Sequence, residues 1–137
     1  TVTDYFFPDE NLPRNRYFEY RDSLTTHIFE VSIFYTGPDK FPVSFLAGYN
    51  FYGADSVNST YFELGYTGKF KEIKYNFFAG FTPYKGSYGT NTGIINIGIK
   101  GERKFNITDK FGIPISVSFL ANPYTENIFL VFGISIK

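Results

Sequence analysis

Asn127-Ile128-Phe129-Leu130-Val131-Phe132-Gly133-Ile134-Ser135-Ile136-Lys137 is the stretch that decides the fold of this chain. Side chains of a β-strand alternate between two faces, so every second residue lies on the same side. One face of this stretch is wholly apolar and carries Ile128, Leu130, Phe132, Ile134 and Ile136. The other face becomes small and polar toward the end of the chain, at Gly133, Ser135 and Lys137. The pattern predicts a strand with one buried and one wet face.

Seven earlier segments repeat this two-residue period, and the sequence shows no helical period. They span residues 1–7, 27–36, 43–52, 60–67, 73–81, 94–105 and 113–121. The connections 8–26, 53–59 and 82–93 are longer than those between them, and residues 16–20 could add a strand extension inside the first one. Long loops on one rim and short turns on the other are typical of outer-membrane barrels. We therefore predict one all-β domain over residues 1–137, an up-and-down antiparallel transmembrane β-barrel with about eight strands in this chain. The last strand is expected to close the barrel on residues 1–7 or on a strand upstream of them.

The composition fits this architecture. The chain has 137 residues with 18 Phe and 12 Tyr, yet its mean hydropathy is only −0.15. Alternating apolar and polar residues produce that combination, and no run of about 18 apolar residues predicts a membrane-spanning helix. The absence of Cys excludes a disulfide framework and Cys-based metal or nucleophile sites. A net charge of zero gives no indication of a basic nucleic-acid surface.

The polar faces of the strands bear on whether the barrel is soluble or membrane-embedded. The apolar face points inward in a soluble barrel and toward lipid in a membrane barrel. Here the polar faces carry charges interspersed with Gly48, Gly65 and Gly80, which suits a narrow and crowded interior. We predict that the following residues line the lumen: Glu30, Glu63, Lys74, Asn76, Asn96, Lys100, Glu102, Ser116 and Ser118. Eight strands leave room only for side chains, so pairing of these charges inside the lumen is favoured over a selectivity lining.

The chain also resembles the TorF-type porins, small outer-membrane barrels of Gram-negative bacteria. The resemblance rests on Asp4-Tyr5-Phe6-Phe7-Pro8, Tyr35-Thr36-Gly37-Pro38, Tyr49-Asn50-Phe51-Tyr52-Gly53-Ala54-Asp55, Tyr61-Phe62-Glu63-Leu64-Gly65-Tyr66 and the ending from Ala121 to Ser135. Members of that family carry further strands upstream, so the resemblance implies that this chain is the C-terminal portion of a larger barrel. The chain departs from the usual outer-membrane ending because its last residue is Lys137 rather than an aromatic residue. Recognition by the barrel-assembly machinery would then rest on the alternating strand as a whole.

Few residues suggest chemistry. His27 is the only histidine, with Asp22 and Ser23 near it in sequence, and we interpret it as an exposed residue at a strand end rather than a catalytic base. There is no Gly-x-Ser-x-Gly motif. We predict no enzymatic activity, no catalytic residues, no metal site and no cofactor. An acidic surface site for calcium at Asp9, Glu10 and Asp22 matches no known loop motif.

The sequence thus predicts a bacterial outer-membrane protein with porin-like passive transport or a structural role in the membrane. Its expected partners are outer-membrane lipid, the barrel-assembly machinery and other outer-membrane proteins, and no nucleic acid. Two alternatives stay open: a soluble, lipocalin-like ligand-binding barrel, and a lipid-modifying barrel enzyme of the outer membrane.

Overall fold

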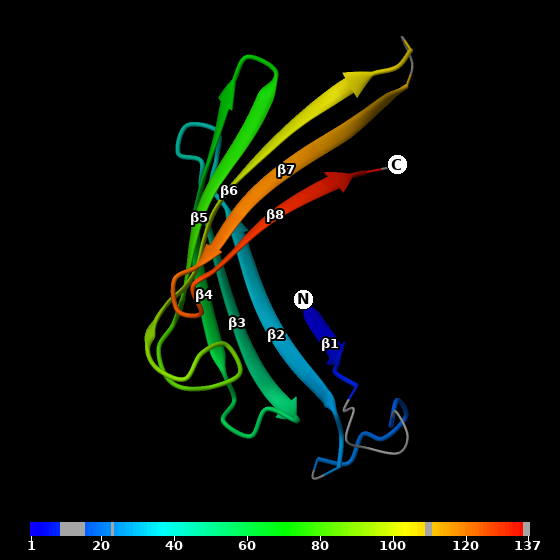
Figure 1. Ribbon diagram of the computed structural model, residues 1–137, viewed down its shortest axis with the longest axis vertical. Coiled ribbons are helices and arrows are strands. Elements are labelled where there is room, and N and C mark those ends of the chain that lie inside the picture. Colours follow the sequence, from blue (N-terminus) through cyan, green and yellow to red (C-terminus); the bar gives the residue numbers. More distant parts are fainter. Residues whose placement is uncertain (9–15, 23, 109–110, 136–137) are drawn as a thin grey trace.

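The structure is a computed structural model that describes residues 1–8, 16–22, 24–108 and 111–135. Its elements are all strands: β1 (Val2–Phe6), β2 (His27–Thr36), β3 (Val43–Gly53), β4 (Thr60–Phe70), β5 (Ile73–Thr82), β6 (Gly93–Asn106), β7 (Gly112–Asn122) and β8 (Asn127–Ile134). Figure 1 shows them as one strongly curled sheet. The predicted all-β class and the eight strands are confirmed.

The sheet is an up-and-down meander. Its strands lie in sequence order, β1 to β8, and each pairs antiparallel with the next one. The connections after β1, β3, β5 and β7 lie at one rim, which we call the loop rim, and those after β2, β4 and β6 lie at the opposite turn rim (Figure 1). The predicted alternation of lengths holds best for the first and fifth connections, because residues 37–42 and 54–59 are equally long.

Two local predictions differ from the structure. Residues 68–72 were expected to form a turn, but β4 continues to Phe70, which pairs with Ile73. The turn is therefore only Lys71 and Glu72, and Lys71 takes the left-handed conformation with a φ of 54°, as tight hairpins require. Residues 16–20 form turns rather than a strand extension.

Most apolar side chains of the sheet are exposed on its convex face, whereas most of the buried side chains are polar. Among the described residues, Ile95 is the one buried hydrophobic side chain, at 7% exposure. The middle of the convex face is apolar and open: Leu64 on β4 is 60% exposed and Phe132 on β8 is 69% exposed. The buried polar side chains are Thr25, His27, Glu30, Asn50, Asp55, Ser59 and Thr82. They lie at or near the loop rim, so the best-packed part of the molecule is polar.

Two β-bulges change the faces predicted from strict alternation. The register shifts between Phe29 and Glu30, so that Tyr52 pairs with Phe29 and lies on the convex face rather than the polar face. The register also shifts between Gly80 and Phe81. This second bulge turns Ile95, predicted to share the outer face of Ile97, into the hollow of the sheet, where it is buried. A bulge adds one residue to one strand and so inverts the side-chain pattern beyond it.

The curled sheet is open along one side and forms a half-barrel. Within the described residues, β1 pairs only with β2 and β8 pairs only with β7. The expected closure of β8 on residues 1–7 is therefore not present. Both edges present backbone N–H and C=O groups that are available for pairing.

Candidate functional site: the concave face and its cavity

The nine residues predicted to line a lumen all lie on the concave face of the sheet. The register places Lys74 opposite Glu102, and Asn76 opposite Lys100. On the next strand, Ser116 lies opposite Glu102 and Ser118 lies opposite Lys100. Nearer the loop rim, Glu63 and Asn96 both neighbour Gly80, and Glu30 lies on β2. That this face lines a channel stays a prediction.

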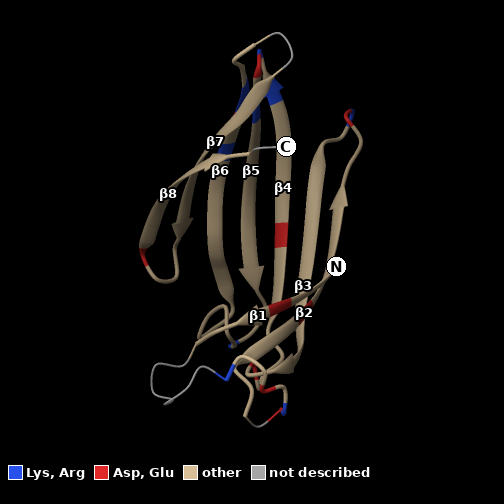
Figure 2. Cartoon of the chain, turned by 90° about the vertical axis from the view of Figure 1, so that its right-hand side faces the viewer, with Lys and Arg blue, Asp and Glu red and all other residues tan. Residues whose placement is uncertain are grey.

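Charges on the concave face are separated along the strands. The acids Glu30 and Glu63 lie toward the loop rim, whereas Lys69, Lys74 and Lys100 lie toward the turn rim. Figure 2 shows the basic segments of the strands gathered toward the turn rim. The predicted pairing of charges occurs only there, where Lys100 Nζ lies 4.0 Å from Glu102 Oε2. Glu30 and Glu63 form no ion pair with the residues that the structure describes.

A cavity of about 700 Å³ occupies the concave face near the loop rim. Its walls come from every strand except β5, and they include Tyr5 and Phe7 near one edge of the sheet and Phe129 at the other edge. Leu46, Ile95 and Leu120 add aliphatic surface, and Asn50 and Asn96 add amide groups. The cavity is thus mostly apolar, with a small number of polar groups, as is typical of sites for small molecules.

The connection between β5 and β6, residues 83–92, folds inward over the cavity. The backbone N–H of Ser87 donates to Ser59 Oγ at 2.6 Å. Gly86 makes this approach possible, because a Cβ at that position would meet Ser59 Oγ at 2.1 Å. The Tyr88 hydroxyl donates to Glu30 Oε2 at 2.7 Å across 58 positions of sequence. Burial, and then the neighbouring carboxylate of Glu30, raise the pKa of Tyr88, so this hydroxyl stays a donor at neutral pH.

Asp55 holds the side chain of Asn50, which is the other polar group beside Glu30 in the cavity wall. The Asn50 side chain donates to Asp55 Oδ2 at 2.7 Å, and the backbone N–H of Ser59 donates to the same oxygen at 2.8 Å. Burial alone would raise the pKa of Asp55, but the hydrogen bonds from Ser59, Asn50 and Val57 outweigh it and hold the pKa below its ordinary value. The amide oxygen of Asn50 is left facing the cavity, 3.4 Å from the Tyr88 hydroxyl.

The second acid of the concave face, Glu63, also accepts a hydrogen bond from a tyrosine. The Tyr61 hydroxyl donates to Glu63 Oε2 at 2.6 Å and accepts a longer bond from Asn96, at 3.4 Å. The ring of Tyr61 lies across Gly80, where a Cβ would meet the phenol oxygen at 2.1 Å. This contact agrees with the expectation that glycine serves a crowded interior.

His27 is not the exposed residue that the sequence suggested. It is 1% exposed, because residues 16–22 fold over it. Its Nδ1 lies 2.8 Å from Asp4 Oδ1, and its Nε2 lies 2.7 Å from the carbonyl oxygen of Tyr17. Nε2 must carry a proton because a carbonyl only accepts. The ring therefore joins β1, β2 and the first loop, and both of its nitrogens are engaged.

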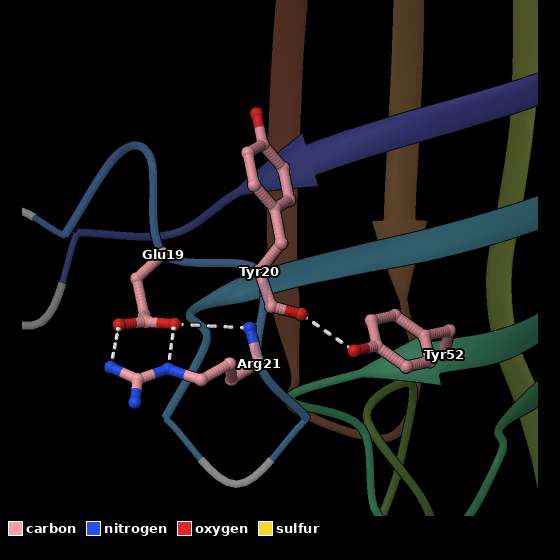
Figure 3. Close-up of polar contacts among 4 residues, drawn as sticks. All are labelled: Glu19, Tyr20, Arg21 and Tyr52. Carbon is pink, nitrogen blue, oxygen red and sulfur yellow. Dashed lines mark hydrogen bonds and ion pairs between the residues drawn. The ribbon is translucent and has the colours of Figure 1, made fainter.

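The first loop is also bound to β3. Figure 3 shows the Tyr52 hydroxyl donating to the carbonyl of Tyr20, at 2.6 Å. Beside it, Arg21 forms a two-pronged pair with Glu19, at 2.6 and 2.8 Å (Figure 3). The bulge that moves Tyr52 to the convex face thus supplies the anchor for this loop.

No group of three or more metal-ligating side chains occurs in the described part of the chain. Asp9, Glu10 and Ser23, which entered the calcium and enzyme alternatives, lie outside the described residues. Within the described residues, we find no helix that is long and apolar enough to cross a membrane. Comparisons with family models, curated proteins and solved structures find no match to this chain.

Sequence reasoning found Glu30 and Glu63 but missed the tyrosines that hold them. Tyr61 could have been found, because it shares the polar face of its strand with Glu63. Tyr88 carried no such signal, since it lies in a loop rich in Gly, Ser and Tyr with no period. Its contact with Glu30 depends on how the whole sheet curls.

Proposed function

We propose that this protein is an outer-membrane β-barrel protein of Gram-negative bacteria with porin-like passive transport. The observation that carries the proposal is the inside-out distribution of side chains: an exposed apolar convex face and a polar, charged concave face. In water, a continuous apolar patch of this kind drives association. In a bilayer, lipid tails cover it and the concave face holds water.

The strand lengths support the same proposal. The long strands, β3, β4, β6 and β7, each have at least 11 residues, and a tilted strand of 9–11 residues spans a bilayer. Their convex faces carry Phe45, Leu64, Ile97 and Val117, all of them exposed. Backbone groups at an open edge are too costly in lipid. The proposal therefore requires that β1 and β8 be paired in the membrane, with each other or with further strands.

Membership of the TorF-type porin family is part of this proposal, and it rests on the sequence motifs given above. The choice of transport over a purely structural role rests on the cavity and on the charged residues that continue along the concave face to the turn rim. Charged residues that line a passage are the usual means of selecting ions.

Location and transport need separate experiments. We expect the folded protein to fractionate with outer membranes and to migrate faster in detergent gels before heating than after it. A protein that stays in the aqueous fraction without detergent would contradict membrane insertion and favour the soluble alternative.

We further expect discrete conductance steps when the purified barrel is added to a planar bilayer. A folded, inserted and electrically silent barrel would leave only the structural role.

The enzymatic alternative depends on His27. Both ring nitrogens are engaged with Asp4 and Tyr17, so neither is free to take a proton from a substrate. We therefore expect His27→Ala to leave the lipid A modification pattern of the host cell unchanged, as mass spectrometry of extracted lipid A would show.

A further inference from the structure

The wall of the cavity combines aromatic rings with one carboxylate. Five rings line it: Tyr5, Phe7, Tyr61, Tyr88 and Phe129. Among the described residues that line the cavity, Glu30 is the one ionisable carboxylate, and none is Lys, Arg or His. Aromatic faces carry partial negative charge and attract cations, so the rings and the carboxylate favour the same sign of charge.

The negative charge at this site has no cationic partner among the described residues. Glu30 is 8% exposed, and its carboxylate accepts a neutral hydroxyl group from Tyr88. Glu63 lies behind the ring of Tyr61, which is part of the cavity wall, and likewise accepts a hydroxyl group. The nearest base along β6 is Lys100, four residues beyond Asn96, or about 13 Å at the rise of a strand. Apolar walls reduce screening, so the carboxylate of Glu30 favours a cation over an anion inside the cavity.

We propose that this cavity binds a small organic cation, an ammonium group carried on an aromatic or aliphatic body. The ammonium group lies between the aromatic rings and Glu30, and the apolar body packs against Ile28, Leu46 and Leu120. The cavity volume of about 700 Å³ lies in the range of small-molecule sites, about 300–1,000 Å³. A bare metal ion is disfavoured because it needs several oxygen ligands, and an organic anion is repelled by Glu30. This inference goes beyond the proposed channel, since binding does not require conductance.

The test is calorimetric titration of the purified full chain in detergent with benzyltrimethylammonium, phenylacetate and benzyl alcohol as the cationic, anionic and neutral probes. We expect the cation to bind at least about tenfold more tightly than either of the others, a difference of about 1.4 kcal/mol. Glu30→Gln should abolish this preference, because it removes the charge and keeps the shape and the acceptor for Tyr88. Glu102→Gln is the matched control at the turn rim, and it should bind the cation as the wild type does.

A second variant tests the contribution of the aromatic rings apart from that of the charge. Its result stands even if Glu30→Gln does not fold. Phe129→Leu should weaken the binding of the cation and leave that of benzyl alcohol unchanged. Each variant is first checked for the gel migration of the folded barrel. Equal binding of the three probes, or no cation binding by folded wild type, would overturn the inference. Cation binding without conductance would support it and count only against the channel.

Discussion

Asp55 shows how one buried carboxylate supports the loop rim. It accepts hydrogen bonds from Asn50, Val57 and Ser59, and Asp55→Asn keeps the size of the side chain but loses its charge. Hydrogen bonds to a charged group contribute about 1.5–3 kcal/mol, so we expect Asp55→Asn to lower the free energy of unfolding at pH 7 by about 2 kcal/mol. Denaturant titration in micelles, followed by circular dichroism, measures this loss.

The same carboxylate predicts a pH dependence with a definite sign. The pKa of Asp55 is lower in the folded protein than its ordinary value of 3.8. Its stabilising contribution is therefore complete above the pKa of the unfolded chain and is lost as the pH falls through the lower pKa of the folded state. The difference between wild type and Asp55→Asn should be full at pH 6 and should shrink in strong acid. A difference that stays constant down to about pH 2 would contradict this assignment.

We expect the hydrogen bonds of His27 to stabilise the first loop. His27→Ala removes the hydrogen bonds to Asp4 and to the carbonyl of Tyr17, at a cost of about 2 kcal/mol for two bonds of about 1 kcal/mol each. We expect limited proteolysis to cleave residues 16–26 much faster in this variant. Glu19→Gln is the control within the same loop. It weakens the Glu19–Arg21 pair, in which the Arg21 side chain is 74% exposed. Ion pairs that solvent reaches contribute little, so the cleavage rate of this variant should match that of the wild type.

At the scale of the elements, the sequence determined which segments become strands, and it did so through a two-residue period. All eight strands begin within one residue of the predicted position, and His27–Thr36 matches at both ends. The positions of the bulges could not be predicted, because doublets such as Phe51-Tyr52 and Ile94-Ile95 do not show which of their two apolar residues is the extra one. Tyr52 and Ile95 were therefore assigned to the wrong faces. The inward fold of residues 83–92 was also beyond prediction, since it rests on contacts between Tyr88 and a distant strand.

The proposed insertion of the sheet in a membrane predicts that a lysine substitution is tolerated on the concave face and not on the convex face. Leu64 lies mid-strand on the convex face and is 60% exposed. In lipid, Leu64→Lys should cost about 2–4 kcal/mol, as lysine does at the bilayer midplane of a barrel. Ser116→Lys is the control on the concave face, where the new ammonium group lies opposite Glu102. We expect only Leu64→Lys to reduce the folded fraction in lipid vesicles, measured by gel migration without heating. Equal tolerance of both variants would contradict a lipid-facing convex surface.

At the scale of the whole molecule, the half-barrel has two electrostatic halves. In the negative half, at the loop rim, Glu30 and Glu63 accept hydrogen bonds from the hydroxyl groups of Tyr88 and Tyr61. The positive half at the turn rim carries Lys69, Lys74 and Lys100, with Glu102 as the acid beside them. A solute that crosses the proposed channel therefore meets both signs of charge in sequence. Which sign dominates the selectivity depends on which half forms the narrower part.

This arrangement predicts that removing the charges of one half shifts ion selectivity in the opposite direction to removing the charges of the other half. Glu30→Gln with Glu63→Gln should move the reversal potential in a salt gradient toward anion selectivity, and Lys74→Gln with Lys100→Gln should move it toward cation selectivity. Screening sets the range of the effect: the Debye length is about 10 Å at 0.1 M salt and about 3 Å at 1 M. Both shifts should therefore be clear in dilute salt and nearly vanish at 1 M. If neither pair changes the reversal potential in dilute salt while conductance persists, the ions do not pass along the concave face.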